Sequence, residues 1–454
     1  MNHPTEELLA DKISNYTVLS GARSYPYDVL DLARMCLADW ICVCIGALDE
    51  PPGIHVENLV LGFMSRGPAA TFRGAKLPPT LASLINGTLA HCLDYDDVHF
   101  PSLSHISAPT WAAVLALASE KNITQQRLLE CFITGFEIGS RLGSNGVGIA
   151  LNDHGWHATG CIGRLAATVA SAALLELESE KIKNAIAIVA TQTSGLTASF
   201  GTDAKSLHSG KAAFDAVFSA QLALSGFRGG LNILEQPNGL INVLIPLNTP
   251  LMCIENLENS WKIRENAIKP YACCGQTHAA IDASRYLNSN LGIEQIEKAI
   301  RVDVDAHPIA SKVAALTNVK EPLAAKFSIS YCCALGLLGY SVNASDFTME
   351  RISQAEIIAL ANKVFLHTDK NLGVTSARVS VTFTNGSQAE HLIKESLGNP
   401  GNPISWEDLK VKFISLVEPR IGKRSYELFD LLRDFGGAKD IGPMWALVNS
   451  GRHS

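Results

Sequence analysis

The stretch Thr159–Leu177, TGCIGRLAATVASAALLEL, decides the fold class of this chain, because it is a long Ala- and Leu-rich run without proline. Two more Ala-rich runs follow it, at Ile182–Ser194 and Ser209–Leu224. Helices with small side chains pack closely against one another, as in helical bundles. We therefore predict that these runs belong to an all-helical bundle.

The chain upstream of this stretch also has helical periodicity. Pro78-Pro79 opens one of these helices, since proline is tolerated in a first helical turn. Asn122-Ile123-Thr124 ends one helix and caps the next. Helices are predicted at Tyr27–Leu48, Leu81–Leu93, Ser107–Glu120 and from the Asn122-Ile123-Thr124 cap to Leu142.

The pattern changes at Lys269-Pro270. The clearest strand is Ala377–Phe383, where apolar and polar residues alternate. Thr384-Asn385-Gly386-Ser387 follows as a hairpin turn and leads into a partner strand that ends near Lys394. The same region is expected to contain a helix at Thr277–Leu287, a strand at Ala299–Ala306 and a helix at Leu323–Leu338.

These patterns predict a mainly α protein of two domains. Residues 1–268 and 398–454 would form a large all-helical domain that is discontinuous in sequence, and residues 269–397 a smaller inserted α+β domain. The Gly- and Pro-rich stretch that begins at Gly398 marks the second boundary. A cleft between the two domains is the expected place for a site.

Composition excludes several classes of function. The 454 residues are 47% hydrophobic and 18% charged, which suits a large buried core rather than disorder. The formal charge is −7 and the sequence contains no basic stripe, so we expect no nucleic-acid partner. The N-terminus does not resemble a secretory signal, and the apolar runs Leu37–Leu48 and Ala166–Leu175 are too short to span a bilayer. We expect a cytoplasmic protein without membrane contact.

Eleven cysteines are present, and the adjacent pairs Cys273-Cys274 and Cys332-Cys333 lack metal-ligand spacing. A reducing compartment and the absence of a structural metal are therefore expected. Cys274 and His278 lie one helical turn apart, which leaves a thiol nucleophile as an alternative.

The segment from His91 to His105 holds three aspartates and three histidines within fifteen positions, at the junction of two predicted helices. It allows three interpretations: a metal site, acid–base chemistry in which an Asp orients a His, or a capped and solvated helix junction. The spacing matches no metal motif such as H-E-x-x-H.

Three further segments could contact an anionic substrate. His157 precedes a helix whose first turn contains Thr159, and a helix N-terminus attracts anions. Lys205 lies in a Gly-flanked segment that does not satisfy the phosphate-loop pattern, so we reject a nucleotide site. Lys269, followed by Tyr271, lies where the two predicted domains join. Each lysine could bind a carboxylate as a point charge.

Taken together, these segments resemble the MmgE/PrpD family. The resemblance covers nearly the whole chain, and its motifs occur in the order expected for the family. The matching strings are Asn86–Asp97 (NGTLAHCLDYDD), His105–Pro109 (HISAP), His157–Gly160 (HATG), Lys205–Gly210 (KSLHSG), Lys269–Tyr271 (KPY) and Ala325–Ser328 (AKFS).

The family includes 2-methylcitrate dehydratases, cis-aconitate decarboxylases and an iminodisuccinate epimerase. The resemblance implies a helical domain with an α+β lid, a homodimer, and a small polycarboxylate as substrate. Carried over by motif, His105 and His157 are the expected acid–base residues and Asp94 orients a histidine. The residues expected to bind substrate are Lys205, Lys269, Tyr271 and Thr159.

This scheme needs no metal and no organic cofactor, because side chains move the proton and lysines hold the developing negative charge. Val98 stands where many relatives carry Thr, so a hydroxyl is missing and the particular substrate stays open. A cofactor-independent lyase, either a dehydratase or a decarboxylase, is the first prediction. The alternatives are an epimerase or isomerase at a carbon beside a carboxylate, and a non-catalytic protein that binds a metabolite.

Overall fold

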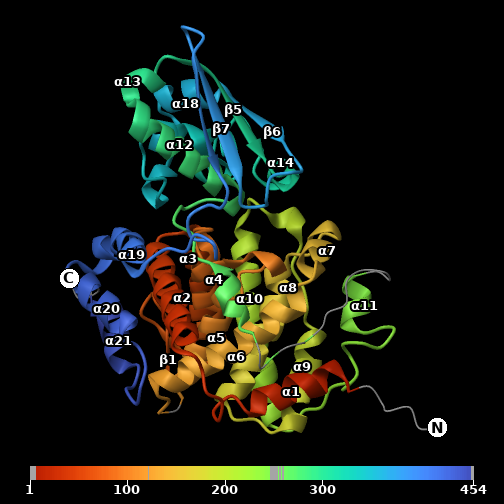
Figure 1. The fold of residues 1–454 in the computed structure, drawn as a ribbon. Helices are drawn as coiled ribbons and strands as arrows, with labels where there is room; N and C mark the ends of the chain where they lie inside the picture. Colours follow the sequence, from red (N-terminus) through yellow and green to blue (C-terminus); the bar gives the residue numbers. More distant parts are fainter. Residues whose placement is uncertain (1–6, 121, 246–253, 255–256, 258–259, 451–454) are drawn as a thin grey trace. The chain divides into compact units, whose positions relative to one another are not determined.

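The structure is a computed structural model that describes residues 7–120, 122–245, 254, 257 and 260–450. The chain divides into two compact units. Unit 1 comprises residues 1–92, 96–267 and 409–454, and unit 2 comprises residues 93–95 and 268–408. Figure 1 shows the elements of both units.

Unit 1 is built almost entirely from α-helices, with two short two-stranded ribbons, β1–β2 and β3–β4 (Figure 1). Its helices are α1 (Leu9–Val18), α2 (Tyr27–Gly46), α3 (Pro51–Leu61), α4 (Pro79–Cys92), α5 (Ser107–Ala118), α6 (Gln125–Gly143), α7 (Val147–Asp153), α8 (Ala158–Leu174), α9 (Ser179–Ala190), α10 (Asp203–Leu224), α11 (Leu240–Leu244), most of α19 (Trp406–Ile421), α20 (Arg424–Arg433) and α21 (Gly442–Val448). Its ribbons pair Ala69–Ala70 with Lys76–Leu77 and Val98–His99 with Asn266–Ala267.

Small residues let the central helices of unit 1 approach one another closely. A Cβ atom added at Gly210 of α10 would clash with Thr88 and with the carbonyl oxygen of Leu84 in α4. One added at Gly135 of α6 would clash with the carbonyl oxygen of Ala166 in α8. All residues of α5 and α8 are buried, as expected for helices that are apolar or small on every face.

The mainly α fold predicted from the sequence is confirmed, since 57% of the chain is helical. The start of α10 differs from the prediction: the helix begins at Asp203 rather than Ser209. An acidic residue in the first turn is favourable there because it offsets the positive end of the helix dipole. Lys205 consequently lies within the first turn of α10 and not in a loop before it.

Unit 2 contains a four-stranded sheet in the order β6-β5-β7-β8 (Figure 1). Its strands are β5 (Ala299–Ala306), β6 (Val364–Thr368), β7 (Ala377–Phe383) and β8 (Gln388–Ile393). β7 pairs antiparallel with β5 and β8, whereas β6 runs parallel to β5. The helices of this unit are α12 (His278–Leu291), α13 (Ile293–Ile296), α14 (Pro308–Val313), α15 (Pro322–Ala325), α16 (Ile329–Leu337), α17 (Met349–Ile352) and α18 (Ala355–Ala361).

The strands predicted at Ala299–Ala306 and Ala377–Phe383 are confirmed at those bounds, and side chains along β7 alternate between buried and half-buried. The single helix predicted over Leu323–Leu338 is wrong, because the chain forms α15 and α16 with a break between them. Ser328 causes a new helix start there, since its hydroxyl accepts the backbone N–H of Tyr331.

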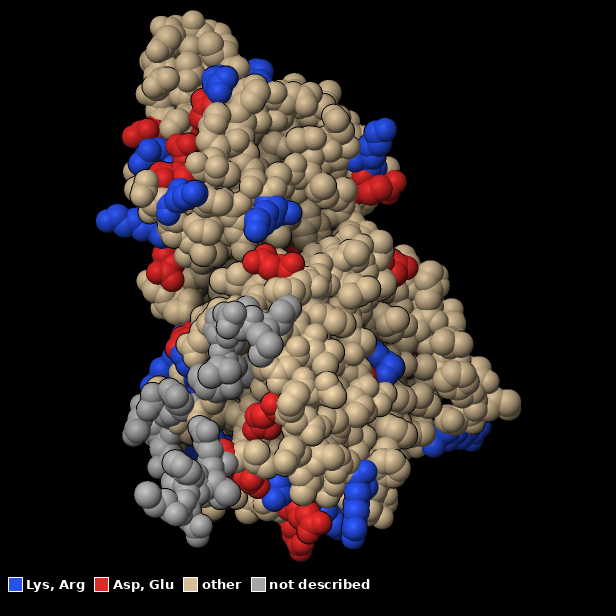
Figure 2. Space-filling view, turned by 90° about the vertical axis from the view of Figure 1, so that its right-hand side faces the viewer, with Lys and Arg blue, Asp and Glu red and all other residues tan. Residues whose placement is uncertain are grey.

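Among the described residues, no helix combines the length and apolar character that crossing a bilayer requires. On the face drawn in Figure 2, positive and negative side chains of the described residues are interspersed rather than gathered by sign. Such a surface gives no single-sign field with which to steer a highly charged polymer.

Candidate active site

One carboxylate in unit 1 contacts the rings of two histidines. His91 lies in the last turn of α4, Asp96 lies in the loop that follows, and His105 lies just before α5. The Nδ1–H of His91 donates to Asp96 Oδ2 over 2.9 Å, and His105 Nδ1 lies 3.1 Å from the same oxygen. The three residues are buried. Asp96 therefore holds both imidazole rings with one carboxylate.

Charge and burial fix the protonation of this cluster. Burial alone would raise the pKa of Asp96, but His105 and His91 hold it well below its usual range. Burial lowers the pKa of His91 to about 4, so this ring is neutral at neutral pH. Because the Nδ1 of His91 carries the proton given to Asp96, its Nε2 carries a lone pair.

That lone pair has an unusual environment. Among the described residues, none makes a hydrogen bond with Nε2 of His91, although the atom is buried. A buried acceptor without a donor costs on the order of 1–3 kcal/mol, and such groups are rare unless a ligand or water satisfies them. Nε2 of His91 can thus accept a hydrogen bond or a proton from a ligand.

Two more histidines extend the cluster. His157, which precedes α8, lies with its ring 5.6 Å from that of His91 and nearly parallel to it. Its Nδ1 lies 3.0 Å from Nδ1 of His208 in α10. The rings of His91 and His105 are 4.6 Å apart. Four imidazoles therefore form a continuous series from Asp96 to His208.

Lys205 provides positive charge beside these rings. It lies in the same helix as His208, one turn earlier, and its side chain is buried. After burial and the neighbouring His91, the charge of Lys205 is the next cause of the lowered pKa of His157. A buried cation next to neutral imidazoles favours an anionic ligand.

Thr159 is in the cluster, but its observed contact is with the protein. Its hydroxyl oxygen accepts the backbone N–H of His105 over 3.1 Å, and the side chain is fully buried. The substrate contact expected of Thr159 stays a prediction. In the structure this residue holds the backbone of His105 in place.

Asp94 and Lys269 lie together in unit 2. Lys269 Nζ donates to the backbone oxygen of Asp94 over 2.8 Å and lies 3.6 Å from its carboxylate. Lys326, for which the sequence analysis assigned no role, donates to the backbone oxygen of Leu93 over 2.6 Å. Both lysines are buried. Asp96 contacts His91 and His105 in unit 1, and the histidine-orienting role expected of Asp94 stays a prediction.

Tyr271 is also buried in unit 2, and its hydroxyl donates to Asp282. Burial raises the pKa of this phenol above its usual value. Burial likewise raises the pKa of the Cys274 thiol to about 11, which does not favour the thiol nucleophile considered from the sequence.

The sequence analysis therefore missed specific roles for His91, Asp96, His208 and Lys326. All four lie inside the quoted motifs, so their positions were visible while their contacts were not. His99 shows the opposite case: it belongs to the same histidine-rich segment, but its Nδ1 bonds to Ser102 and its ring packs edge-on against Phe136. Residue type alone could not separate His91 from His99.

A buried ion network supports the loop that carries Asp96. Asp39 of α2 lies 2.5 Å from Lys412 of α19 and accepts the backbone N–H of Asp97. Ser107 donates to the carboxylate of Asp97 over 2.6 Å. Burial and then the nearby Asp39 raise the pKa of Asp97 to about 7. Helices α2 and α19 and the loop are thus joined through buried ionisable groups.

The cluster of His91, Asp96 and His105 also fits the size of a metal site, since one ligand atom from each lies within 4.8 Å of the others. An ion is not needed to hold the group together, because Asp96 already accepts a hydrogen bond from His91. We therefore interpret it as an Asp–His acid–base group.

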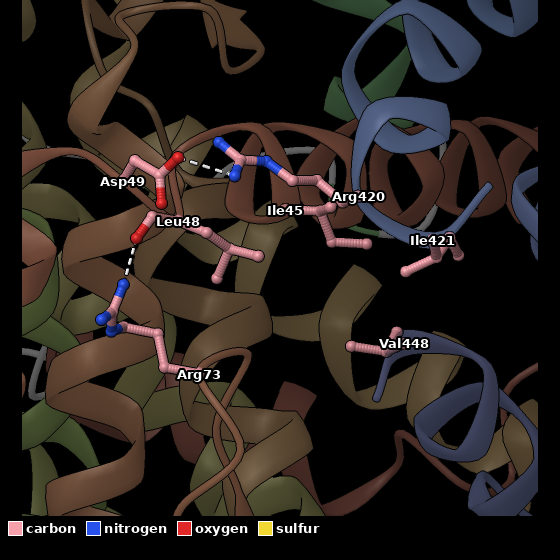
Figure 3. Close-up of a pocket in the computed structure, with 7 residues that line it drawn as sticks. All are labelled: Ile45, Leu48, Asp49, Arg73, Arg420, Ile421 and Val448. Atoms are coloured by element: carbon pink, nitrogen blue, oxygen red, sulfur yellow. Dashed lines mark hydrogen bonds and ion pairs between the residues drawn. The ribbon is translucent and has the colours of Figure 1, made fainter. Parts of the chain in front are cut away.

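A separate cavity of about 270 Å³ lies elsewhere in unit 1 (Figure 3). Arg420 pairs there with Asp49 over 2.7 Å, and Arg73 donates to the backbone oxygen of Leu48 and to Glu57. Each guanidinium already faces a carboxylate, and the rest of the lining is mainly apolar. This cavity is a poor match for a polycarboxylate.

A helical scaffold with buried Asp–His chemistry defines an acid–base site, and comparison with known proteins gives the family. Residues 9–250 match the MmgE/PrpD N-terminal domain, and residues 271–432 match the MmgE/PrpD C-terminal domain. The chain belongs to the MmgE/PrpD family, as its motifs predicted.

The similar proteins below are named as cis-aconitate decarboxylases or as a protein like them. The chain is 26% identical to a cis-aconitate decarboxylase of Aspergillus terreus over 458 aligned positions, which cover 93% of this chain and 92% of that protein. It is 23% identical to a cis-aconitate decarboxylase-like protein of Aspergillus oryzae, over 96% of each chain. It is 26% identical to the cis-aconitate decarboxylase of Homo sapiens, over 74% of this chain and 72% of that one.

Proposed function

We propose that this protein is a lyase that removes carbon dioxide or water from a small di- or tricarboxylic acid by proton transfer. The observation that carries the proposal is the buried Asp96–His91 pair, whose Nε2 lone pair has no hydrogen-bond partner among the described residues. Such a group can take a proton from, or give one to, a carbon beside a carboxylate. Decarboxylase activity is the first candidate, because the relatives above carry that name.

The residues have distinct roles in this proposal. His105 and His157 exchange protons with the substrate, together with His91, while Asp96 orients His91 and His105. Lys205 attracts a carboxylate toward the rings through its buried charge. The substrate-binding roles predicted for Lys269 and Tyr271, and an active-site role for Asp94, stay predictions. Each can be tested by substitution with Ala and comparison of KM.

The proposed chemistry uses side chains alone and needs neither a metal nor an organic cofactor. Cytoplasmic location, the homodimer and the two domains with boundaries at residues 269 and 397 likewise stay predictions. Exposed apolar side chains at the end of α3 and just after it, Leu59, Leu61, Phe63 and Met64, are compatible with a second copy covering that surface.

Proton NMR in heavy water tests the function directly. Chelator-treated protein would be incubated separately with cis-aconitate, citrate, 2-methylcitrate and iminodisuccinate. We expect loss of a carboxylate from cis-aconitate or a new alkene signal from one of the hydroxy acids. Deuterium entry with stereoisomer formation alone would replace the lyase with an epimerase. Folded protein that leaves all four acids unchanged would contradict the proposal, and activity that disappears on chelation and returns with a divalent ion would contradict its metal-free chemistry.

A further inference from the structure

His208 and His157 share one hydrogen bond through equivalent ring nitrogens. Their Nδ1 atoms lie 3.0 Å apart, and their ring centroids are 5.2 Å apart. A bond between two Nδ1 atoms contains a single proton, so one ring donates and the other accepts. His157 is buried within the cluster, whereas His208 is half-buried.

The loop before α10 holds both rings in this arrangement. The backbone N–H of His157 donates to the carbonyl oxygen of Gly195 over 3.0 Å. Gly195 has φ +122°, and a Cβ at this position would lie 3.3 Å from Cγ and Nδ1 of His208. Arg164 donates to Ser194 next to this glycine over 3.1 Å. The contact between the histidines is therefore built into the fold.

Burial and neighbouring positive charge lower the pKa of both rings, which favours their neutral forms. Burial is the main cause of the lowered pKa of each ring. The charge of Lys205 adds positive potential at His157, while Arg164 and Lys205 do so at His208. Two neutral rings that share one Nδ1 proton must differ at Nε2, because one presents N–H there and the other a lone pair.

We propose that His208 is a proton-relay and positioning residue, which sets the tautomer of His157 and connects it to solvent. The inference rests on the proposed function and adds a residue to it. When His208 donates, His157 presents Nε2–H and is an acid. When His157 donates, it presents a lone pair at Nε2 and is a base.

Atoms and charges balance when the relay supplies the proton for a decarboxylation. The C–CO₂⁻ bond breaks, carbon dioxide leaves, and the electron pair stays on the carbon. That carbon takes the proton from Nε2 of His157, while Nδ1 of His157 takes the shared proton from His208. Nε2 of His208 then takes a proton from water. One solvent proton is consumed in each turnover, and neither ring is left as an ion.

The reverse transfer resets the pair after the product leaves. Water gives a proton to Nε2 of His157, the Nδ1 proton returns to His208, and Nε2 of His208 releases its proton to solvent. No net proton is gained or lost in this second step. An abstraction reaction would use the same path in the opposite direction.

Substitution with Asn separates positioning from relay. In the variant His208→Asn, the side-chain amide can occupy the place of Nδ1 and hydrogen-bond to His157, but it cannot pass a proton on. His208→Leu removes both abilities. His154→Asn is the matched control, because His154 is exposed and its Nδ1 donates to the backbone oxygen of Ala150. Turnover of cis-aconitate, or of the acid identified by NMR, would be measured over a range of concentrations of small buffers.

We expect His208→Asn to lower kcat by about tenfold or more, with thermal unfolding unchanged and His154→Asn within about twofold of wild type. Small buffers should restore its rate in proportion to their acidity, whereas the wild-type rate should not depend on buffer concentration. A His208→Asn protein that equals wild type, or one whose loss no buffer restores, would overturn the relay while leaving the function intact. Inactivity of the wild type toward every acid would overturn the function and the relay together.

Discussion

Asp96 is the residue through which the histidine cluster is ordered. Its carboxylate lies within 3.1 Å of Nδ1 of both His91 and His105, and their proximity keeps it ionised. A carboxylate that accepts from Nδ1 selects the tautomer whose Nε2 faces the substrate. The reactivity proposed for His91 therefore depends on a neighbour that would not itself touch the reacting carbon.

Replacing Asp96 with Asn should lower kcat by about 10²- to 10⁴-fold, because an amide can stabilise the wrong tautomer of the histidine. Steady-state kinetics on the acid identified by NMR would measure the loss. Asp303→Asn is a matched control, since Asp303 also accepts from a histidine, His367, but at a half-buried position in β5. Equal activity of Asp96→Asn and Asp303→Asn would remove Asp96 from the mechanism.

At the scale of residues, the sequence could identify the segment from His91 to His105 but not the contacts within it. His105, His157 and Lys205 were named as candidates, and the structure places all three in one cluster. Periodicity could not show that Asp96 contacts the histidines, because residues 93–97 form neither helix nor strand. Asp94 there has φ +52°, a left-handed conformation that turns the chain between the two carboxylates.

At the scale of helices, close backbone contact holds the site residues in place. Gly210 lies in α10 two residues after His208, where α10 packs on α4, the helix whose last turn carries His91. The contact that determines the distance between these two helices thus lies next to the histidines that they carry. Added volume at Gly210 would separate the helices or force them to shift.

We expect Gly210→Ala to lower the free energy of unfolding by about 1–3 kcal/mol and to reduce activity as well. Denaturant titration would measure the first effect. Gly230→Ala is the matched control, because Gly230 is outside the helices and an added Cβ there would have no neighbour within 4 Å among the described residues. A Gly210→Ala protein as stable as Gly230→Ala would show that the α4–α10 spacing is not tight.

The buried network of Asp97, Asp39 and Lys412 gives a pH-dependent stability. The raised pKa of Asp97 means that the folded protein binds its proton more tightly than the unfolded chain does. The stability from this group is complete below about pH 4 and is lost as the pH rises through about 7. A shift of this size corresponds to on the order of 4 kcal/mol.

Asp97→Asn should therefore gain stability relative to wild type as the pH rises from about 4 to 7. The quantity to measure is the difference in free energy of unfolding between the two proteins, because His91 and His157, with lowered pKa values, act in the opposite direction in both. A difference that does not change with pH would contradict the assignment of a protonated Asp97.

Elements with strong local patterns were predictable from the sequence. β7 has the predicted bounds, and α8 (Ala158–Leu174) begins one residue before the predicted run Thr159–Leu177 and ends three residues before its end. The break between α15 and α16 was not predictable, because Ser328 lies in an otherwise helical pattern and its capping role depends on the folded chain. β6 was missed for a related reason: its parallel pairing with β5 requires residues far apart in sequence and no hairpin turn marks it.

At the scale of the whole molecule, the family motifs fall into two groups. His91, Asp96, His105, His157, Lys205 and His208 belong to unit 1, whereas Asp94, Lys269, Tyr271 and Lys326 belong to unit 2. The motifs predicted the family because each is a short, recognisable string and they occur in the order expected for the family. They could not predict this grouping, which depends on how a three-residue segment, 93–95, associates with the lysines of unit 2.

The central claim is that the histidine cluster of unit 1 moves the proton. The most direct test is the turnover number of His105→Gln and His157→Gln, relative to wild type, on the acid that the NMR experiment identifies. The account predicts a loss of about 100-fold or more for each variant, with unchanged thermal unfolding. Turnover within about twofold of wild type in both folded variants would contradict it, because the chemistry would then belong to other residues.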